Sequence, residues 1–455
     1  MKTIPFVNEG LGNSSYVVDL GAGKAVLVDP DRSVDRYMDV LRRDDLQAIG
    51  VFETHLHADF VSGARELGHQ MEAPVFVPAG GQVAFPHTGV LHDQMVHLNG
   101  SDVSVIASPG HTPEHVSYLV QAVGSPPLLF SGGSLIVGGA ARTDLISPAM
   151  TEPLTRAQFR TLRQAFTELP DETLLYPTHG GGSFCSTGAG GERSSTLGRE
   201  RRENPLLSLT DEEEFVSWFP STFPSVPEYF FRMRALNQAG PRLRHLIPDP
   251  RALDAAEFAE LRSSSIIVDA RGKEDYAAGH IPGSFNNTLR DAYAVWLGWL
   301  VPENARLLFV TDDHTPIEEI VTESLLVGYE SFGGWLKGGA EAWSESGRAL
   351  ETTELVDARE ARRYLLEGAA SVDIREPSEY QEGHIEGSLH VPLGKLMEAM
   401  HLVPKDRPLV VYCGHGERAS TAISVLEGAG WRNLVNLDGG IGAWSSAGYK
   451  VQQGA

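Results

Sequence analysis

Cysteine is scarce in this sequence, with only Cys185 and Cys413 among its 455 residues. So few cysteines exclude a disulfide framework and are typical of a reducing compartment. Long apolar runs are also lacking, since no stretch approaches the roughly 18 apolar residues of a membrane span. Residues 1–6 lack the apolar core of a signal peptide. We therefore expect a cytoplasmic protein that does not enter a membrane.

Basic charge is in deficit as well. Lysine and arginine number 37 against 60 aspartates and glutamates, which leaves a formal net charge of −23. Nucleic acids and anionic membranes are polyanions, so neither is an expected partner. Solubility is the simplest role of the charge. The sequence leaves open whether the chain forms a homo-oligomer.

The sequence does contain enough apolar material for folded domains throughout. Hydrophobic residues make up 42% and charged residues 21%, ordinary proportions for a soluble protein. A chain of 455 residues is too long for one hydrophobic core. Its length therefore predicts roughly two to four domains.

Short strands dominate up to about residue 122. Residues 16–20 and 25–29 predict a hairpin, and Val116–Gln121 predicts a further strand. Helical patterns cover 34–43 and 154–169. Residues 246–250, rich in proline, have the character of a linker. We expect a first domain over 1–245.

Beyond this linker the chain repeats itself. The pattern Asp269-Ala270-Arg271 is echoed by Asp373-Ile374-Arg375, and each is followed by a Gly-His-Ile element containing His280 or His384. Each copy alternates apolar strands with helical patterns, which predicts two parallel-sheet α/β domains, over 251–350 and 354–455. We interpret both histidines as structural.

A lone thiol stands at a strand-to-helix turn in the second copy. The buried-strand pattern Leu409–Tyr412 leads directly into Cys413, and a helix opens near Ala419. Such a turn presents backbone N–H groups and the positive end of a helix dipole to the sulfur. That environment stabilises thiolate over thiol and produces a nucleophile. A structural buried cysteine is the alternative.

The second copy resembles the rhodanese (sulfurtransferase) family, whose loop is CxxGxR. The resemblance implies that Cys413 carries the sulfur and that Arg418 acts with it in catalysis. It implies support of the fold by Asp373 and Arg375, and it implies substrate binding by the rest of the loop, namely Gly414, His415, Gly416 and Glu417.

The first copy lacks the thiol. Alignment of the strand Leu307–Val310 with Leu409–Tyr412 places Thr311 where Cys413 stands. Two acids, Asp312 and Asp313, follow at the position that should bind an anion. We interpret this copy as an inactive domain that serves as a spacer or docking surface.

Histidines alternate with other residues near the N-terminus. In the stretch His55-Leu56-His57-Ala58-Asp59-Phe60, the two histidines and the aspartate point the same way if the loop is extended. Imidazole and carboxylate groups at this spacing are ligands for borderline metal ions. His111 and His179 follow at later turns.

This region resembles the metallo-β-lactamase-fold hydrolases, and more closely their glyoxalase II and persulfide dioxygenase branch. The resemblance implies an αββα sandwich, and the motifs that carry it include Ser108-Pro109-Gly110-His111 and Tyr176-Pro177-Thr178-His179. Joined to the two later domains, it is similar to fusions of a persulfide dioxygenase with rhodanese domains.

Two positions depart from that family. Phe60 replaces the last histidine of HxHxDH, and Gly133 replaces an aspartate ligand. The resemblance leaves His55, His57 and His111 as the first metal site, with Asp59 and His179 as weaker ligands. It implies one Fe(II), with Zn(II) or no metal as alternatives. Asp144 follows Arg142 closely and is interpreted as its ion-pair partner.

These patterns predict a three-domain sulfur-metabolism protein. Its first function would be oxidation of a low-molecular-weight thiol persulfide at a mononuclear metal, coupled to transfer of sulfane sulfur by Cys413, with thiosulfate and sulfite as further small-molecule partners. One alternative is a sulfurtransferase whose first domain is an inactive scaffold. Another is a non-catalytic sulfur carrier or docking protein. For Cys185 the absence of a role is favoured over thiol exchange.

Overall fold

A computed structural model describes residues 1–98, 100–187, 191–312 and 314–454. It divides into two compact units, one containing Met1–Ile247 and Thr322–Gly328 and the other Pro248–Val321 and Tyr329–Ala455. Asp313, expected to lie in the loop after Thr311, is outside the described residues. Within those residues, no helix has the length and apolar character needed to cross a membrane.

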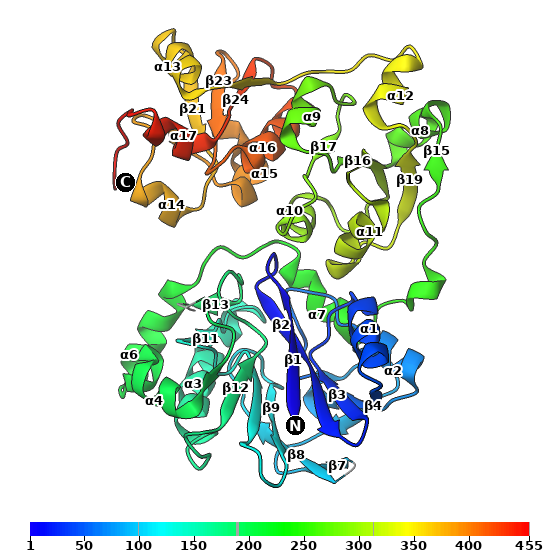
Figure 1. Ribbon diagram of the computed structural model, residues 1–455. Coiled ribbons are helices and arrows are strands. Elements are labelled where there is room, and N and C mark those ends of the chain that lie inside the picture. Colours follow the sequence, from blue (N-terminus) through cyan, green and yellow to red (C-terminus); the bar gives the residue numbers. More distant parts are fainter. Residues whose placement is uncertain (99, 188–190, 313, 455) are drawn as a thin grey trace. The chain divides into compact units, whose positions relative to one another are not determined.

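The first unit contains two six-stranded sheets and a small two-stranded one (Figure 1). The first sheet has the order β1 (Lys2–Asn8), β2 (Asn13–Gly21), β3 (Lys24–Val28), β4 (Gln47–Phe52), β5 (Val75–Pro78) and β6 (Thr88–Val90). The second has the order β14 (Ser195–Thr196), β12 (Leu174–Pro177), β10 (Leu128–Gly132), β9 (Val116–Gln121), β8 (Ser101–Ala107) and β7 (Met95–Leu98). The small sheet pairs β11 (Ala140–Ala141) with β13 (Ser186–Thr187), and the helices are α1 (Asp35–Arg43), α2 (Ala64–Met71), α3 (Pro148–Gln164), α4 (Leu197–Glu203), α5 (Pro205–Ser208), α6 (Glu212–Trp218) and α7 (Phe230–Ala239).

The two large sheets pack face to face. Val26 and Phe52 of the first sheet share one buried cluster with Val105 and Phe130 of the second. The opposite face of the first sheet packs against α1 and α2, and the opposite face of the second packs against α3 and α6. Burial of both faces of each sheet explains the nearly continuous apolar runs in the strands. The αββα sandwich expected from the sequence is confirmed.

Helix α3 begins earlier than the sequence pattern predicts. The expected range was 154–169, whereas the helix spans Pro148–Gln164. Pro148 occupies the first helical position, where its fixed φ favours the helix and its missing N–H has no partner to lose. The helix therefore begins at the proline and also ends sooner, at Gln164.

The second unit contains two five-stranded parallel sheets with the same strand order, so the repeat seen in the sequence is a repeat of structure. The first sheet has the order β15 (Ala252–Leu253), β19 (Phe332–Leu336), β18 (Leu307–Val310), β16 (Ile266–Asp269) and β17 (Phe285–Asn286). The second has the order β20 (Glu354–Val356), β24 (Leu434–Leu437), β23 (Leu409–Tyr412), β21 (Ala370–Asp373) and β22 (Leu389–His390). The helices along this part of the chain are α8 (Ala255–Leu261), α9 (Lys273–Ala278), α10 (Tyr293–Leu300), α11 (Ile317–Leu326), α12 (Gly339–Glu345), α13 (Ala358–Leu366), α14 (Pro377–Glu382), α15 (Leu396–Ala399), α16 (Glu417–Gly428) and α17 (Gly440–Ser446).

A buried aspartate–arginine pair follows the equivalent strand in each copy. Arg375 donates to Asp373 from Nε and from Nη2, the latter at 2.6 Å, and Nη2 also reaches the Gly383 carbonyl at 2.7 Å. Arg271 and Asp269 make the same contacts in the first copy. Both arginines fasten the turn behind the strand, which is the fold-supporting role expected for Asp373 and Arg375.

Helix α16 is shared between the two copies. The Asn286 amide of β17 donates to the Ser424 hydroxyl at 3.0 Å, and His280 Nε2 lies 3.4 Å from Glu427 Oε2. Both Ser424 and Glu427 belong to α16, which carries the Cys413 loop at its N-terminal end. The first copy therefore packs against the helix that follows the thiol of the second copy.

Candidate functional site

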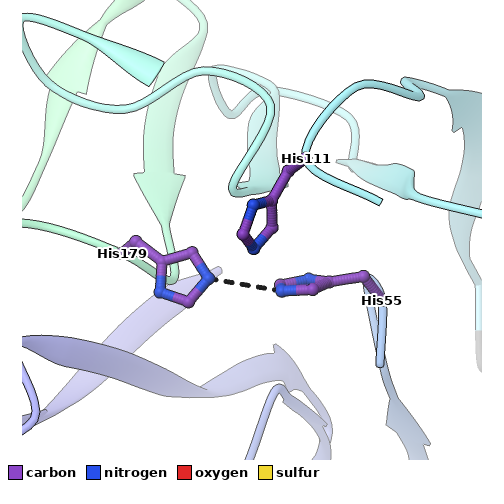
Figure 2. Close-up of side chains that lie close together, drawn as sticks. All are labelled: His55, His111 and His179. Carbon is purple, nitrogen blue, oxygen red and sulfur yellow. Dashed lines mark hydrogen bonds between the residues drawn. The ribbon is translucent and has the colours of Figure 1, made fainter. Parts of the chain in front are cut away.

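Three imidazoles converge at the ends of strands in the sandwich domain (Figure 2). His55 follows β4, His111 lies in the loop between β8 and β9, and His179 follows β12. One nitrogen of each lies within 4.8 Å of the others, and Nε2 of His55 is 3.2 Å from Nε2 of His179. All three side chains are buried. Three separate loops thus bring their nitrogens to one point.

Hydrogen bonds fix which nitrogen of two of these rings can accept a metal. His111 Nδ1 lies 2.6 Å from the Arg142 carbonyl, which only accepts, so Nδ1 donates and Nε2 keeps its lone pair. The Thr54 hydroxyl donates to Asp29 at 2.7 Å, so it accepts from His55 Nδ1 at 2.9 Å. Nε2 of His55 is left with its lone pair. A partner on the second nitrogen is the usual support for a metal-binding histidine.

Buried polar atoms at this point lack partners. Among the described residues, no hydrogen bond reaches His111 Nε2 or either carboxylate oxygen of Asp59. Asp59 is only 1% exposed, and its Oδ2 lies 3.3 Å from His179 Nδ1. A buried carboxylate without hydrogen bonds is costly unless a cation neutralises it. The nitrogens of His55, His111 and His179 therefore form a donor set that fits a divalent metal ion, and Asp59 belongs to a second group with His57 and His179.

The spacing of the nitrogens agrees with that fit. Ligands about 2.0–2.1 Å from a tetrahedral zinc lie about 3.3 Å from each other. The measured separation of 3.2 Å between His55 and His179 is close to this value. Without a cation, the same 3.2 Å separation is a hydrogen bond in which the neutral His55 Nε2 accepts from His179 Nε2.

His57 is not grouped with His55 and His111, but its ligand atom lies within 4.8 Å of those of Asp59 and His179. Its Nε2 lies 3.1 Å from Glu53 Oε2 and 3.4 Å from Asp29 Oδ1, and its ring stacks on Phe60 with centroids 4.2 Å apart. The expected ligands were His55, His57 and His111, with His179 weaker. The structure instead groups His179 with His55 and His111. The Phe60 side chain is fully buried and packs flat against His57 in the place where the family carries another histidine.

The pKa values of the histidines also distinguish His57 from His55 and His111. Burial, together with the neighbouring imidazoles, holds the pKa values of His55 and His111 well below their usual range, so both rings are neutral. Burial also lowers the pKa of His57, but the Asp29 and Glu53 carboxyl groups outweigh it and raise that pKa to about 10. The carboxyl groups of Asp29 and Glu53 thus favour the protonated form of His57, whereas His55 and His111 are held neutral.

Asp29, which the sequence pattern does not single out, joins the loops of the site. It follows β3 in a left-handed conformation with φ +48°, which aspartate tolerates better than most residues. Its carboxylate accepts from the Thr54 amide at 2.7 Å and from the hydroxyls of Thr54 and Thr178. One carboxylate thereby ties together the ends of β3, β4 and β12. An acid directly after a buried strand was the available signal.

Gly133 has no room for the aspartate that the family carries. A Cβ built there would lie 2.6 Å from His111 Cδ2 and 2.9 Å from the Ala141 Cβ. Its amide donates to His115 Nε2 at 2.9 Å. His115, whose pKa burial lowers to about 3, was also not expected at the site. The glycine here permits the close approach of His111.

Two further expectations in this domain can be checked. Arg142 donates to Asp144 at 2.7 and 2.9 Å, which confirms that Asp144 is the partner of an ion pair. Cys185 is fully buried, and burial raises the pKa of its thiol well above the usual value. A protonated, inaccessible thiol fits the interpretation that Cys185 has no chemical role.

The second candidate site is the loop that holds Cys413. The loop leads from β23 to α16, and the Gly416 amide donates to Cys413 Sγ at 3.0 Å. Gly416 has φ +108° and a Cβ there would touch Lys273 Nζ at 3.0 Å, so glycine is needed both for its conformation and for its size. The carbonyl of Cys413 accepts from the Ile441 amide at 2.9 Å. The loop is thus fixed around the sulfur.

The charges of two arginines act on this thiol. Arg418 pairs with Glu379 through two hydrogen bonds, and burial alone would lower its pKa, but Glu379 and Cys413 outweigh burial and raise it. The charge of Arg290, which follows β17 in the first copy, also acts on Cys413 and on Arg418. Neither Arg290 nor Glu379 was expected from the loop motif. Both lie far from Cys413 in the sequence.

Thr311 occupies the corresponding position of the first copy. It follows β18 as Cys413 follows β23. A Cβ at Gly339 would meet the Thr311 carbonyl oxygen, just as one at Gly440 would meet the Cys413 carbonyl oxygen. The equivalence drawn from sequence is therefore geometric as well, and the first copy has no sulfur nucleophile at this loop.

Family models match both halves of the chain. The metallo-beta-lactamase superfamily matches residues 8–179, and the rhodanese-like domain matches twice, at 254–346 and 348–447. These matches agree with the expected order of a metallo-β-lactamase-like domain followed by two rhodanese-like domains.

Three solved structures are similar to this chain over different shares of its length. A metallo-beta-lactamase from Staphylococcus aureus subsp. aureus COL is 28% identical, with 74% of this chain and 98% of that chain covered and a TM-score of 0.64. ETHE1 from Myxococcus xanthus is 26% identical over 52% of this chain and 96% of that chain, with a TM-score of 0.44. A rhodanese-related protein from Thermoplasma volcanium is 30% identical over 22% of this chain and 97% of that chain, with a TM-score of 0.21.

Proposed function

Because the chain belongs to the metallo-β-lactamase superfamily through residues 8–179 and to the rhodanese-like family through its two later domains, we propose that it is a sulfur-metabolism enzyme that transfers sulfane sulfur through Cys413. The observation that carries the proposal is the 3.0 Å hydrogen bond from the Gly416 amide to Cys413 Sγ. It is made at the N-terminal end of α16, a helix of 12 residues. Amide hydrogens and a helix N-terminus stabilise a negative sulfur.

The transfer step follows from this placement. The Cys413 thiolate attacks the outer sulfur of thiosulfate, a new S–S bond forms, and the old S–S bond breaks with its electron pair leaving on sulfite. The persulfide on Cys413 then passes its terminal sulfur to a thiolate or back to sulfite. Arg418 and Arg290 supply positive charge near the sulfur, which favours anionic donors over neutral ones.

A thiosulfate:cyanide sulfurtransferase assay tests this function. Cys413→Ser should reduce turnover to the uncatalysed rate, whereas Cys185→Ser should retain it, because Cys185 is buried in the other unit. Equal background rates for the wild type and both variants would overturn the catalytic proposal. That result would favour a non-catalytic sulfur carrier or docking protein.

A second candidate function belongs to the sandwich domain. The convergence of His55, His111 and His179, with no hydrogen bond on His111 Nε2, supports a metal-dependent oxidation of a thiol persulfide. Overall, RSSH + O₂ + H₂O would give RSH, sulfite and two protons. The three histidines would hold the ion, and Fe(II) would supply the redox chemistry that activates dioxygen. Sulfite so formed is an acceptor for the persulfide on Cys413.

Metal content and oxygen uptake test the second function together. Iron in the purified protein, measured by mass spectrometry, should approach one per chain and fall in His55→Ala/His111→Ala. Oxygen uptake should then depend on glutathione persulfide, used as the probe. Zinc in place of iron, or iron without persulfide-dependent uptake, would overturn the oxidation proposal. The sulfurtransferase proposal would be unaffected, with the first domain acting as a scaffold.

A further inference from the structure

One peptide group stands between the Cys413 sulfur and a lysine of the other rhodanese-like domain. The amide of Gly416 donates to Cys413 Sγ at 3.0 Å, and the carbonyl of His415, which belongs to the same peptide group, accepts from Lys273 Nζ at 2.9 Å. A trans peptide is planar and points its N–H and C=O in opposite directions. The Lys273 ammonium therefore binds the carbonyl end of this peptide group, and the Cys413 sulfur binds its N–H end.

The ammonium of Lys273 is held at this place by acids from several elements. It lies 2.8 Å from Asp438 Oδ1, 3.6 Å from Glu417 Oε1 and 3.7 Å from Glu274 Oε1. The residue is only 8% exposed. Burial lowers the pKa of Lys273, but Asp438 and Glu417 outweigh burial and raise it, so the side chain stays charged.

The architecture of the repeat does not require a lysine here. Lys273 is the first residue of α9 and comes two positions after Arg271 of the buried pair. The equivalent place in the second copy, two positions after Arg375, is Pro377, the first residue of α14. The same fold is thus built with a proline at this position. The contact with the Cys413 loop is what distinguishes Lys273.

We propose that Lys273, from the rhodanese-like domain that has no thiol, is a positioning residue for Cys413. By binding the His415 carbonyl it fixes the orientation of the 415–416 peptide and polarises it, which strengthens the N–H that faces the sulfur. The effect is greatest when the sulfur is negative, as thiolate or persulfide. The contribution of Lys273 to turnover rests on the proposed sulfurtransferase function. The effect of Lys273 on the pH dependence of the free Cys413 thiol does not rest on that function.

Charged residues other than Lys273 also affect the titration of the Cys413 thiol. The charges of Arg418 and Arg290 act on Cys413, and Glu417 Oε1 lies 3.6 Å from Lys273 Nζ. All of these remain when Lys273 alone is changed. A shift in the titration of Cys413 on substitution of Lys273 therefore reports the lysine.

The experiment measures the rate of Cys413 alkylation by iodoacetamide against pH in the full chain, with the modified peptide quantified by mass spectrometry. Lys273→Met should move the midpoint of the profile up by about half a pH unit or more, which is a threefold or larger loss of thiolate below the midpoint. Lys273→Arg keeps the charge and should stay near the wild type. Lys337→Met, at an exposed position of the same domain, is the matched control and should change nothing.

The rates of sulfur transfer should rank the Lys273 variants in the same order as the alkylation rates do. At neutral pH, Lys273→Met should lower kcat for thiosulfate about threefold to tenfold, and the loss should shrink as pH rises above the new midpoint. A purely structural lysine would lower the amount of active protein without moving the pH profile.

An unchanged alkylation midpoint in folded Lys273→Met, or an equal shift in Lys337→Met, would overturn the inference. If Lys273→Met does not fold, Lys273→Gln takes its place, because it keeps a donor for the His415 carbonyl without the charge. Its midpoint should then lie above those of the wild type and Lys273→Arg, and identical midpoints for all three would overturn the inference equally. A shifted midpoint in a protein that shows no sulfur transfer would sink the proposed function and leave the coupling of Lys273 to Cys413 intact.

Discussion

Arg418 and Glu379 are joined by two hydrogen bonds of 2.7 Å, one from each terminal nitrogen of the guanidinium. Glu379 lies on α14 and Arg418 on α16, so the pair connects two helices of the second rhodanese-like domain. A planar fork paired with a carboxylate has one favoured orientation. The ion pair therefore sets the direction in which the charge of Arg418 faces the Cys413 loop.

Glu379→Gln should change how stability depends on pH. Burial raises the pKa of Glu379, but its hydrogen bonds with Arg418 outweigh burial and lower it. A carboxyl with a lowered folded-state pKa stabilises the fold above its unfolded pKa, and this stabilisation is lost as pH falls through the folded value. The Tm of the wild type should exceed that of Glu379→Gln near neutral pH, and the two should converge below about pH 4. Glu382→Gln, at an exposed position of the same helix, should track the wild type, and parallel curves for Glu379→Gln would contradict the prediction.

The histidines of the sandwich domain should differ in their effect on metal content. His111→Ala and His179→Ala each remove a nitrogen of the converging set and should lower metal occupancy at least about tenfold. His57→Gln should lower it less, because His57 faces Asp29 and Glu53. Mass spectrometry of the purified variants measures this directly. A larger loss in His57→Gln than in His179→Ala would restore the ligand set expected from sequence.

Gly133→Ala should also lower metal occupancy, although it adds only a methyl group. The new Cβ would lie 2.6 Å from the His111 ring, which must move. Gly133→Asp, the change that restores the family's acid, should share this defect for the same reason. Gly191→Ala is the matched control, since a Cβ there meets nothing within 4 Å. Higher metal content in Gly133→Asp than in the wild type would show that the loop adjusts and that the missing carboxylate is the larger obstacle.

Arg290→Ala should weaken the use of anionic sulfur donors. The charge of Arg290 acts on Cys413 and its loop, and its removal should raise KM for thiosulfate about threefold at low ionic strength. Because salt screens exposed charges, the difference from the wild type should shrink at about 1 M salt. Steady-state kinetics at two salt concentrations measure it. Arg306→Ala removes an exposed charge of the same domain and should leave KM unchanged; the same increase there would contradict a local role for Arg290.

Local patterns predicted much of this structure. The strands β9 and β23 have the expected bounds, and a turn from Cys413 to Gly416 joins β23 to α16, which begins at Glu417, two residues before the expected Ala419. The ion pair of Asp144 with Arg142 also followed from residues nearby in sequence. Each of these features depends on interactions over a few positions.

The parts that were missed depend on distant contacts. His57 and His55 are two residues apart, yet one faces Asp29 and Glu53 and the other faces His179, because the loop after β4 is not extended as the alternation assumed. The contact of Lys273 with His415 spans 142 positions. The positions of His57 and Lys273 in the sequence do not indicate which residues their side chains will contact.

Because α16 contacts both copies, the thiol-free rhodanese-like domain supports the helix that follows the Cys413 loop. Ser424 and Glu427 have their partners on the other copy, so cutting the chain between the copies would strip a buried face of the helix that begins beside Cys413. The two copies should therefore unfold in a single transition. The thiol-free domain would then contribute to the stability of the helix that follows Cys413, although it carries no sulfur nucleophile of its own.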